Sequence, residues 1–285
     1  MSTRSNEGRI GANPNLPAEN ELSETTELKF ITPTEFVELP SKGRFYDVSH
    51  PLHNQDVVEI KHMTTKEEDI LSSVTLLKKG LALDRMLSNI LVDKRVKVDD
   101  LFLGDKNALI IAARAHGYGP SYDTAIVCPL CKGSQDYSFD LNSLKTQFPA
   151  EELLEKYKAK ITEQGTLLLP LPKINHQMEL RLLSSGDEKR ISETQEANRK
   201  KRDFVESSVS DFLNCVVVAV DGITDRRQLR GFVETLPALQ VRYIRKVYNI
   251  LAPELDLSHE FRCAECDYEG AMEVPLTADF FWPNA

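Results

Sequence analysis

Two Cys-x-x-Cys pairs constrain the fold of this chain more than any other feature of its sequence. Cys128 and Cys131 lie in the stretch CPLC, and Cys263 and Cys266 lie in CAEC. Four thiolates fill the tetrahedral coordination of a zinc ion, so a site of this kind has no position for water or substrate and is structural. The sequence therefore predicts one structural Zn2+ ion as the cofactor, with these four cysteines as its ligands.

The two pairs are far apart along the chain. Between Cys131 and Cys263 lie 131 residues, whereas a compact zinc ribbon separates its pairs by about 15–20 residues. A link that closes such a long loop removes more conformational entropy from the unfolded chain than a link across a short loop. We expect the metal to join two distant segments, in a zinc ribbon that is split in sequence.

Other roles compete for the cysteines. A proline lies inside CPLC, as in some thiol oxidoreductases, but strand-like residues precede and follow both pairs, whereas a thioredoxin-type pair needs a strand-to-helix setting. Two pairs without metal, or disulfides, remain as alternatives, and His259, four positions before Cys263, is a substitute ligand. Cys215 lies in the apolar run NCVVVAV and is expected to be a buried small apolar residue.

Composition narrows the class of protein. The 285 residues carry a net charge of −9, with a pI of about 5.3. A chain this acidic lacks the basic footprint of a nucleic-acid binder, so a zinc-ribbon nucleic-acid-binding module is the less favoured alternative, and the basic run at 198–203 is expected to be a solvated helix face. No apolar run reaches the length of a membrane span, and the N-terminus lacks a signal-peptide core. We therefore expect no membrane contact and a cytosolic location where the protein is made.

Matching features precede the two cysteine pairs. Each half contains an expected strand, at 57–63 and at 177–183, followed by a capping box that starts a helix. The boxes are Thr64 with Glu67 or Thr65 with Glu68, and Ser185 with Glu188. The offset between corresponding features rises from 120 residues at the strands to 135 residues at the cysteines, as a duplication with small later insertions would leave.

The helices and the strands after the cysteines follow the same pattern. Each half has an amphipathic helix with an apolar face, formed by Leu83, Met86, Leu87, Ile90 and Leu91 and by Val209, Phe212, Leu213, Val216 and Val217. Each has a further helix, capped by Asp105 or by Thr235 with Pro237 in its first turn. In each half a leucine, Leu141 or Leu276, stands 13 positions after the first cysteine, and an apolar residue, Phe139 or Val274, stands two positions before that leucine. This spacing predicts a strand after each knuckle.

These observations predict an α+β fold of two divergent repeats, each made of a strand, helices, a cysteine knuckle and a strand. The expected organisation is a flexible N-terminal arm at 1–33, a first repeat at 34–145, a linker with a short charged helix at 146–176, and a second repeat at 177–285. Pro170 and Pro172 make part of that linker an edge strand or a connector. The alternative is two unrelated helical stretches that each end in a knuckle.

No catalytic motif is recognisable in the sequence, so we expect a protein that is not an enzyme. The segments expected to contact partners are the arm, the exposed turn at 41–46, and the C-terminal residues 279–285, which hold Phe280, Phe281 and Trp282. We expect these aromatic side chains to pack onto the body rather than to lie exposed. The Gly-rich stretch at 115–123 is expected to be a helix end and a turn.

Several stretches resemble the baseplate hub proteins of T-even-type contractile-tailed phages. They are LPSKGRFY, DLFLGDKNALIIAARAHGYGPSYDTAIVCPLC, FRCAECDYE and FFWP, and the resemblance runs from about residue 36 to residue 283. It implies a structural or assembly role without enzyme activity, in a multi-protein complex with other hub and tail proteins. The implied location is the virion tail baseplate, with the host cytoplasm during assembly. Whether the protein stays in the particle or leaves as an assembly factor (a chaperone) is left open.

Overall fold

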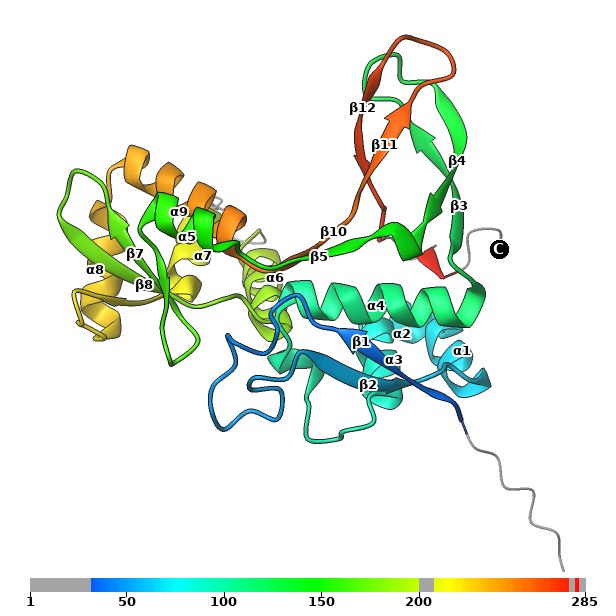
Figure 1. Ribbon diagram of the computed structural model, residues 1–285, viewed down its shortest axis with the longest axis horizontal. Coiled ribbons are helices and arrows are strands. Elements are labelled where there is room, and N and C mark those ends of the chain that lie inside the picture. Colours follow the sequence, from blue (N-terminus) through cyan, green and yellow to red (C-terminus); the bar gives the residue numbers. More distant parts are fainter. Residues whose placement is uncertain (1–31, 200–207, 277–279, 282–285) are drawn as a thin grey trace, which may run out of the picture. The chain divides into compact units, whose positions relative to one another are not determined.

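The structure, a computed structural model, describes residues 32–199, 208–276 and 280–281 (Figure 1). The expected arm therefore lies outside the described residues except for Thr32 and Pro33, as do Trp282 and the basic run from residue 200 onward. The described part mixes helices with several antiparallel sheets, which confirms the α+β class. None of the helices described there has both the length and the hydropathy that a membrane span requires.

The N-terminal part is a two-stranded sheet packed with helices around one apolar core. Strands β1 (Thr34–Glu38) and β2 (Val57–Lys61) pair antiparallel, with Val37 opposite Val58. The helical elements that follow are α1 (Thr65–Ser72), α2 (Val74–Lys78), α3 (Ala82–Ile90), the short 3-10 helix η1 (Val98–Asp100) and α4 (Leu103–Tyr118). The expected apolar face on α3 is confirmed, because Met86, Leu87 and Ile90 are buried in this core.

The first capping box is confirmed, but the predicted cap of α4 is wrong. Glu67 Oε2 accepts hydrogen bonds from the Thr64 backbone N–H at 2.8 Å and from the Thr64 hydroxyl at 2.6 Å, at the start of α1. Helix α4 begins at Leu103, with Phe102 as its N-cap, so Asp105 lies inside the first turn. Its carboxylate is only 1% exposed, and it is used for tertiary contacts instead of capping.

The turn at 41–46 was expected to be an exposed partner surface, and this expectation is wrong for most of its residues. Asp105 accepts hydrogen bonds from the Ser41 N–H at 2.9 Å, from the Ser41 hydroxyl at 2.7 Å and from the Tyr46 hydroxyl at 2.7 Å. Ser41 and Tyr46 are buried with Asp105, and Phe45 is buried in the second apolar core described below, while Lys42 and Arg44 are exposed. A buried carboxylate requires donors of this kind, so the turn faces inward. We call Asp105, Ser41 and Tyr46 the anchor.

A four-stranded antiparallel sheet forms the basis of a second apolar core. Its strand order is β6 (Lys160–Ile161), β7 (Leu167–Leu171), β8 (His176–Leu180) and β9 (Val217–Val220). The helices of this part are α5 (Glu151–Tyr157), α6 (Ser185–Arg199), α7 (Ser208–Val216), α8 (Arg226–Thr235) and α9 (Ala238–Leu251). Residues 146–176, expected to be a linker, contribute α5 and two strands to this part, and α5 confirms the short charged helix.

Pro170 lies in β7 at a position where one side of the strand has no strand partner among the described residues, so the expected edge is present only locally. Strand β6 pairs only with Leu167 and Leu168 of β7, so among the described residues β7 has no strand partner on that side at Pro170. On the other side, Pro170 is opposite Gln177 of β8. A residue without a backbone N–H is tolerated at such a position.

The second capping box lies one residue earlier than predicted. The Ser184 N–H donates to Asp187 Oδ2 at 3.1 Å, and the Asp187 N–H donates to the Ser184 hydroxyl at 3.2 Å, at the start of α6. Ser185 instead accepts a hydrogen bond from Lys106 Nζ at 2.7 Å. Because Asp187 is also paired with Arg181 at 2.5 Å, tertiary contact selects this carboxylate rather than that of Glu188.

The helices near the C-terminal half differ from the prediction at two places. Thr235 was expected to cap a helix, but it ends α8, an unpredicted helix whose cap Asp225 accepts from the Gln228 N–H at 2.9 Å. Helix α9 starts at Ala238 with Pro237 as its N-cap. The apolar face expected on one helix is divided, because α7 ends at Val216 and the β-branched run that follows forms β9.

Three short antiparallel pairs complete the described elements. They are β3 (Ser121–Val127) with β4 (Ser134–Asp140), β5 (Lys145–Gln147) with β10 (Glu254–Asp256), and β11 (Ser258–Arg262) with β12 (Glu269–Glu273), and the short helix η2 (Leu141–Ser143) follows β4. We call the β3–β4 pair the first knuckle hairpin and the β11–β12 pair the second. Phe139 and Val274 are buried, as the pattern of residues after each cysteine pair predicts. The division of the whole chain into two repeats stays a prediction.

Candidate metal centre

The two Cys-x-x-Cys pairs occupy the turns of the two knuckle hairpins. In each turn, the N–H of the first cysteine donates to the carbonyl five residues later: Cys128 to Gly133 at 2.9 Å and Cys263 to Tyr268 at 3.0 Å. The two turns therefore have the same length and the same closing bond, although their sequences differ. Each turn presents its pair of sulfurs from the end of a strand.

The four sulfurs lie at the spacing that a tetrahedral metal site requires. Cys128 Sγ lies 3.7 Å from Cys266 Sγ, and Cys131 Sγ lies 3.7 Å from Cys263 Sγ. All four sulfurs are within 4.8 Å of one another. Metal–sulfur bonds of about 2.3 Å in a tetrahedron give sulfur–sulfur edges of about 3.8 Å. The residues present therefore fit a metal ion, and we call these four cysteines the clasp.

The surroundings of the four sulfurs oppose the presence of four thiolate anions without a cation. Burial disfavours the Cys128 thiolate, yet the backbone N–H groups of Cys131 and Leu130 lower the pKa of this thiol to about 7. The N–H of Tyr268 favours a thiolate at Cys266, but burial and the other three sulfurs raise the pKa of Cys266 to about 12. A bound cation removes this opposition, because it compensates the negative charge that the sulfurs share.

The hairpins also contact each other away from the sulfurs. The Gln135 side chain donates to the Arg262 carbonyl at 3.3 Å and accepts from the Ala264 N–H at 2.8 Å. The Tyr137 hydroxyl donates to the Glu260 carbonyl at 2.8 Å. These bonds align the two knuckle hairpins, so the sulfurs meet in a geometry that the protein fixes in advance.

Two other candidate residues lie outside the clasp. His259 Nε2 lies 3.0 Å from the Ser143 hydroxyl and 3.2 Å from the Asp140 carbonyl, and the cluster of candidate ligands does not include it. Cys215 is half-buried rather than fully buried, and it lines a separate cavity. The expectation of a fully buried Cys215 is therefore wrong, because this residue of α7 is among those that line that cavity.

The C-terminal aromatic residues pack onto the body beside the first knuckle hairpin. Phe280 and Phe281 are 1% and 2% exposed, which confirms the expected packing for these two residues. Arg114 Nε donates to the Phe280 carbonyl at 2.9 Å, and the Phe280 ring makes an edge contact with Tyr122 at 4.9 Å. The stretch at 115–123 contains the end of α4, as expected, with Gly119 at a φ of 90° as its C-cap. Only Gly119 and Pro120 separate this helix from β3, so the expected turn does not extend to residue 123.

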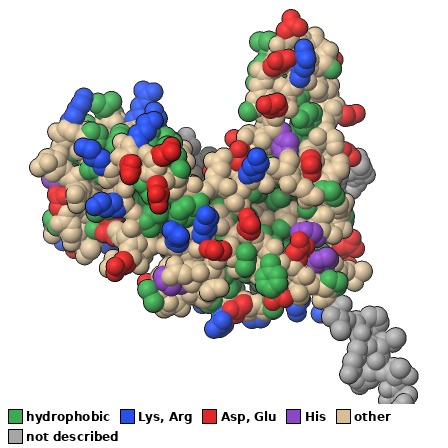
Figure 2. Space-filling view, in the orientation of Figure 1, with side chains coloured by type: hydrophobic (Ala, Val, Ile, Leu, Met, Phe, Trp, Pro, Cys, Tyr) green, Lys and Arg blue, Asp and Glu red, His purple; other side chains and the backbone are tan. Residues whose placement is uncertain are grey.

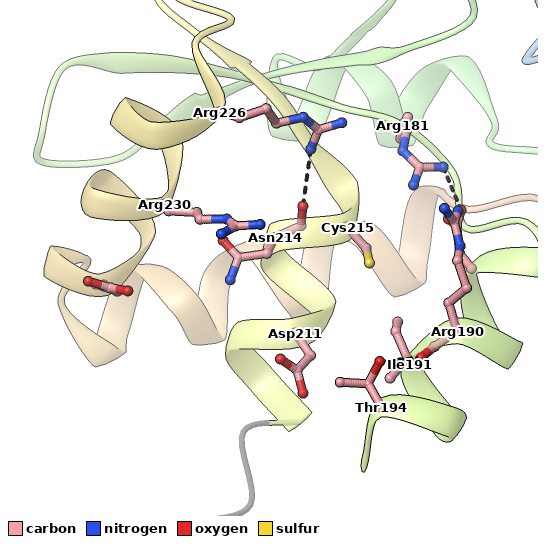
Figure 3. Close-up of a pocket in the computed structure, with 11 residues that line it drawn as sticks. Arg181, Arg190, Ile191, Thr194, Asp211, Asn214, Cys215, Arg226 and Arg230 are labelled. Carbon is pink, nitrogen blue, oxygen red and sulfur yellow. Dashed lines mark hydrogen bonds and ion pairs between the residues drawn. The ribbon is translucent and has the colours of Figure 1, made fainter. Parts of the chain in front are cut away.

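A cavity rich in arginine was not predicted from the sequence. It has a volume of about 520 Å³ and is lined by the side chains of Arg181, Arg190, Arg226 and Arg230, among others (Figure 3). Only the pair at i and i+4 in the stretch RRQLR gives a sequence signal for it, and such pairs are common on solvated helices. On the face in Figure 2, Lys and Arg side chains are interspersed with Asp and Glu side chains rather than gathered into one basic field.

A family model described as T4 bacteriophage base plate protein matches residues 32–282. No curated protein and no solved structure matches the chain. The matched region contains both knuckle hairpins and all four cysteines of the clasp.

Proposed function

Because this chain belongs to the T4 bacteriophage base plate protein family, we propose that it is a non-enzymatic structural protein of the central hub of the tail baseplate. Membership gives the protein a baseplate role in the virion tail and association with other baseplate proteins. The hub position is supported by the sequence stretches that resemble hub proteins, from LPSKGRFY near the N-terminus to FRCAECDYE in the second knuckle.

The observation that carries the structural role is the clasp. Cys128, Cys131, Cys263 and Cys266 hold one Zn2+ ion, and their sulfurs are all within 4.8 Å of one another. Four sulfur ligands leave no coordination position for water or substrate, so the metal stabilises the fold and does not perform chemistry. An all-thiolate set is selective for soft metals, zinc among them.

The metal joins the ends of two repeats, one at 34–145 and one at 177–285, with the arm at 1–33 and the segment at 146–176 outside them. The matching closing bonds of the two turns, at 2.9 and 3.0 Å, support this division. A duplicated chain that closes on itself through a metal presents one fixed surface to its neighbours in the hub.

The metal is tested by elemental analysis of the full chain purified without chelator. We expect about one equivalent of zinc, held through dialysis. Cys131→Ser is expected to lose it, whereas Cys215→Ser, which changes a cysteine outside the clasp, is expected to retain it. Protein that contains five titratable thiols and no metal, or iron in place of zinc, would contradict the zinc assignment.

The hub position is tested by affinity purification of the tagged protein from infected cells and by mass spectrometry of purified tails. We expect hub and tail proteins to co-purify, and we expect the chain to be present in mature tails. Presence on assembly intermediates in the host cytoplasm but absence from mature tails would favour the alternative, a transient assembly factor. Co-purification with neither would contradict both.

A further inference from the structure

The arginine-lined cavity lies between α6, α7 and α8, away from the clasp. Besides the four arginines, its walls include Asp187, Asp211 and Glu234. In Figure 3, Arg226 and Arg230 extend from α8 toward Asn214 and Cys215 on α7, while Arg181 and Arg190 lie on the other side of the cavity. The cavity thus has two cationic walls, one formed by Arg181 and Arg190 and the other by Arg226 and Arg230.

One of these walls is neutralised within the protein. Asp187 is 1% exposed, and it accepts from Arg181 Nη1 at 2.5 Å through Oδ2 and from Arg190 through Oδ1. Burial alone would disfavour the carboxylate, but the bonds from Arg181 and the Ser184 N–H lower the pKa of Asp187 to about 2. This carboxylate therefore stays charged and holds both guanidinium groups in place.

The other wall is not neutralised. Arg226 and Arg230 lie one helical turn apart on α8, where two like charges repel. Arg226 donates to the backbone carbonyl of Asn214, at 3.3 Å. Glu234 follows Arg230 by one turn in the same cavity, but among the described residues drawn in Figure 3 no ion pair joins Arg226 or Arg230 to a carboxylate. A guanidinium has five donor positions and binds a carboxylate with two parallel bonds. The pair is therefore ready for an anionic ligand from outside.

We propose that this cavity is a docking site for an acidic segment of a neighbouring protein, whose Glu or Asp carboxylate is bound by Arg226 and Arg230. Glu234 also lines the cavity, and its charge opposes the high charge density of a nucleic acid or a free phosphate more than that of one carboxylate. A single carboxylate carried by a peptide meets Arg226 and Arg230 and is small enough for a cavity of about 520 Å³. The partner is thus a protein, recognised by charge.

The test is fluorescence anisotropy with the full chain and a short fluorescein-labelled peptide of alternating Glu and Ser. Each lost charge-assisted pair is expected to weaken binding about tenfold, so Arg226→Gln and Arg230→Gln are the informative variants. Arg227→Gln is the matched control, because Arg227 lies on the same helix, is exposed and does not line the cavity. Circular dichroism checks that each variant is folded.

The proposal is supported if Arg226→Gln and Arg230→Gln lose binding while Arg227→Gln binds as the unchanged protein does. A matched Gln–Ser peptide is expected not to bind. A charge reversal, Arg230→Glu, is expected to bind a Lys–Ser peptide that the unchanged protein ignores. The proposal is overturned if the Gln–Ser peptide binds as tightly as the Glu–Ser peptide, or if Arg227→Gln loses as much binding as the other two variants. It is also overturned if an oligothymidylate competes more strongly than the unlabelled acidic peptide. Each outcome is independent of whether the protein stays in the particle, and none of them measures the clasp.

Discussion

Two long-range joints hold distant parts of this chain together, and they use different chemistry. The clasp brings residues 128–131 to residues 263–266 through four sulfurs that share one metal position. The anchor brings the turn at 41–46 to Asp105 through three hydrogen bonds of 2.7 to 2.9 Å. The clasp depends on a ligand that a chelator can remove, whereas the anchor depends only on groups within the chain.

The difference has a consequence for how each joint responds to its surroundings. Metal binding requires deprotonated thiols and falls away with acid or with chelator. The anchor has no external component, and it fails only when one of its own polar groups is changed. Chelator should therefore increase hydrogen exchange in the knuckle hairpins. It should not increase exchange in the turn at 41–46, where Ser41 and Tyr46 remain bonded to Asp105 of α4.

The largest expected effect comes from breaking the clasp. Cys128→Ser removes a buried ligand, and we expect loss of the metal and a decrease in the free energy of unfolding on the order of 5–10 kcal/mol. Urea denaturation with and without chelator measures this, because chelator should destabilise the unchanged protein and leave the variant as it is. Cys215→Ser is the control. Unchanged stability and one tightly bound metal in Cys128→Ser would contradict the assignment of the clasp.

The next largest effect comes from breaking the anchor. Asp105→Ala leaves the Ser41 N–H, the Ser41 hydroxyl and the Tyr46 hydroxyl without their buried acceptor. Unsatisfied buried groups cost about 1–3 kcal/mol each, so we expect the free energy of unfolding to fall by about 3 kcal/mol. Zinc content should not change. A variant that loses metal together with stability would show that the two joints are one cooperative unit.

A pH series separates the joints by the sign of their response. Burial raises the pKa of Asp105 above its ordinary value, so between the unfolded and folded pKa the native state binds more protons than the unfolded state. Stability from the anchor is therefore greatest in acid and falls as pH rises through that window. Stability from the clasp changes in the opposite direction, because acid protonates the thiols and releases the metal.

The anchor component can be isolated in a Cys128→Ser background, where no clasp is present. We compare that variant with the double variant that also carries Asp105→Asn. The part of the free energy of unfolding that depends on Asp105, which is the difference between the two, is expected to fall with rising pH from about 4. Chemical denaturation across the pH series measures it. An unaltered slope in the double variant would show that Asp105 does not titrate in this range.

The smallest expected effects come from single hydroxyl groups. Tyr46→Phe removes a donor to Asp105, and Tyr137→Phe removes a donor to the Glu260 carbonyl between the knuckle hairpins. A typical hydrogen bond contributes about 1 kcal/mol, and a bond to a charged group about 1.5–3 kcal/mol. We therefore expect Tyr46→Phe to cost more than Tyr137→Phe in thermal denaturation. The reverse order would mean that the hairpin contact is more important than the anchor contact.

The features that the sequence predicted well depend on residues close together in the chain. The Cys-x-x-Cys pairs indicate a metal site because two ligands three positions apart in a turn already point to one ion. The Thr64–Glu67 box and the helix at 151–157 were predicted correctly for the same reason, since their contacts are within one helical turn. The helix end at 115–123 was likewise indicated by its local glycines.

The features that the sequence missed depend on partners far away in the chain. Asp105 reads as a helix cap, but its donors lie 59 and 64 residues earlier. The sequence predicted Ser185 as the start of a capping box, but its hydroxyl accepts a hydrogen bond from Lys106, 79 residues away. The box forms one residue earlier, where Asp187 is also paired with Arg181. Helix α8 was not predicted at all, although Asp225 can be recognised afterwards as its cap.

By itself, the sequence determined that four cysteines form two matched turns, because ligand chemistry is carried by the residues and their spacing. Only the tertiary structure decided which carboxylates are buried, which turn faces inward, and which arginines line a cavity without a carboxylate partner among the described residues. The physical reason is that the state of a polar group depends on the donors and charges around it. For Asp105, Asp187 and Arg230, those neighbours are set by the packing of elements that are remote in sequence.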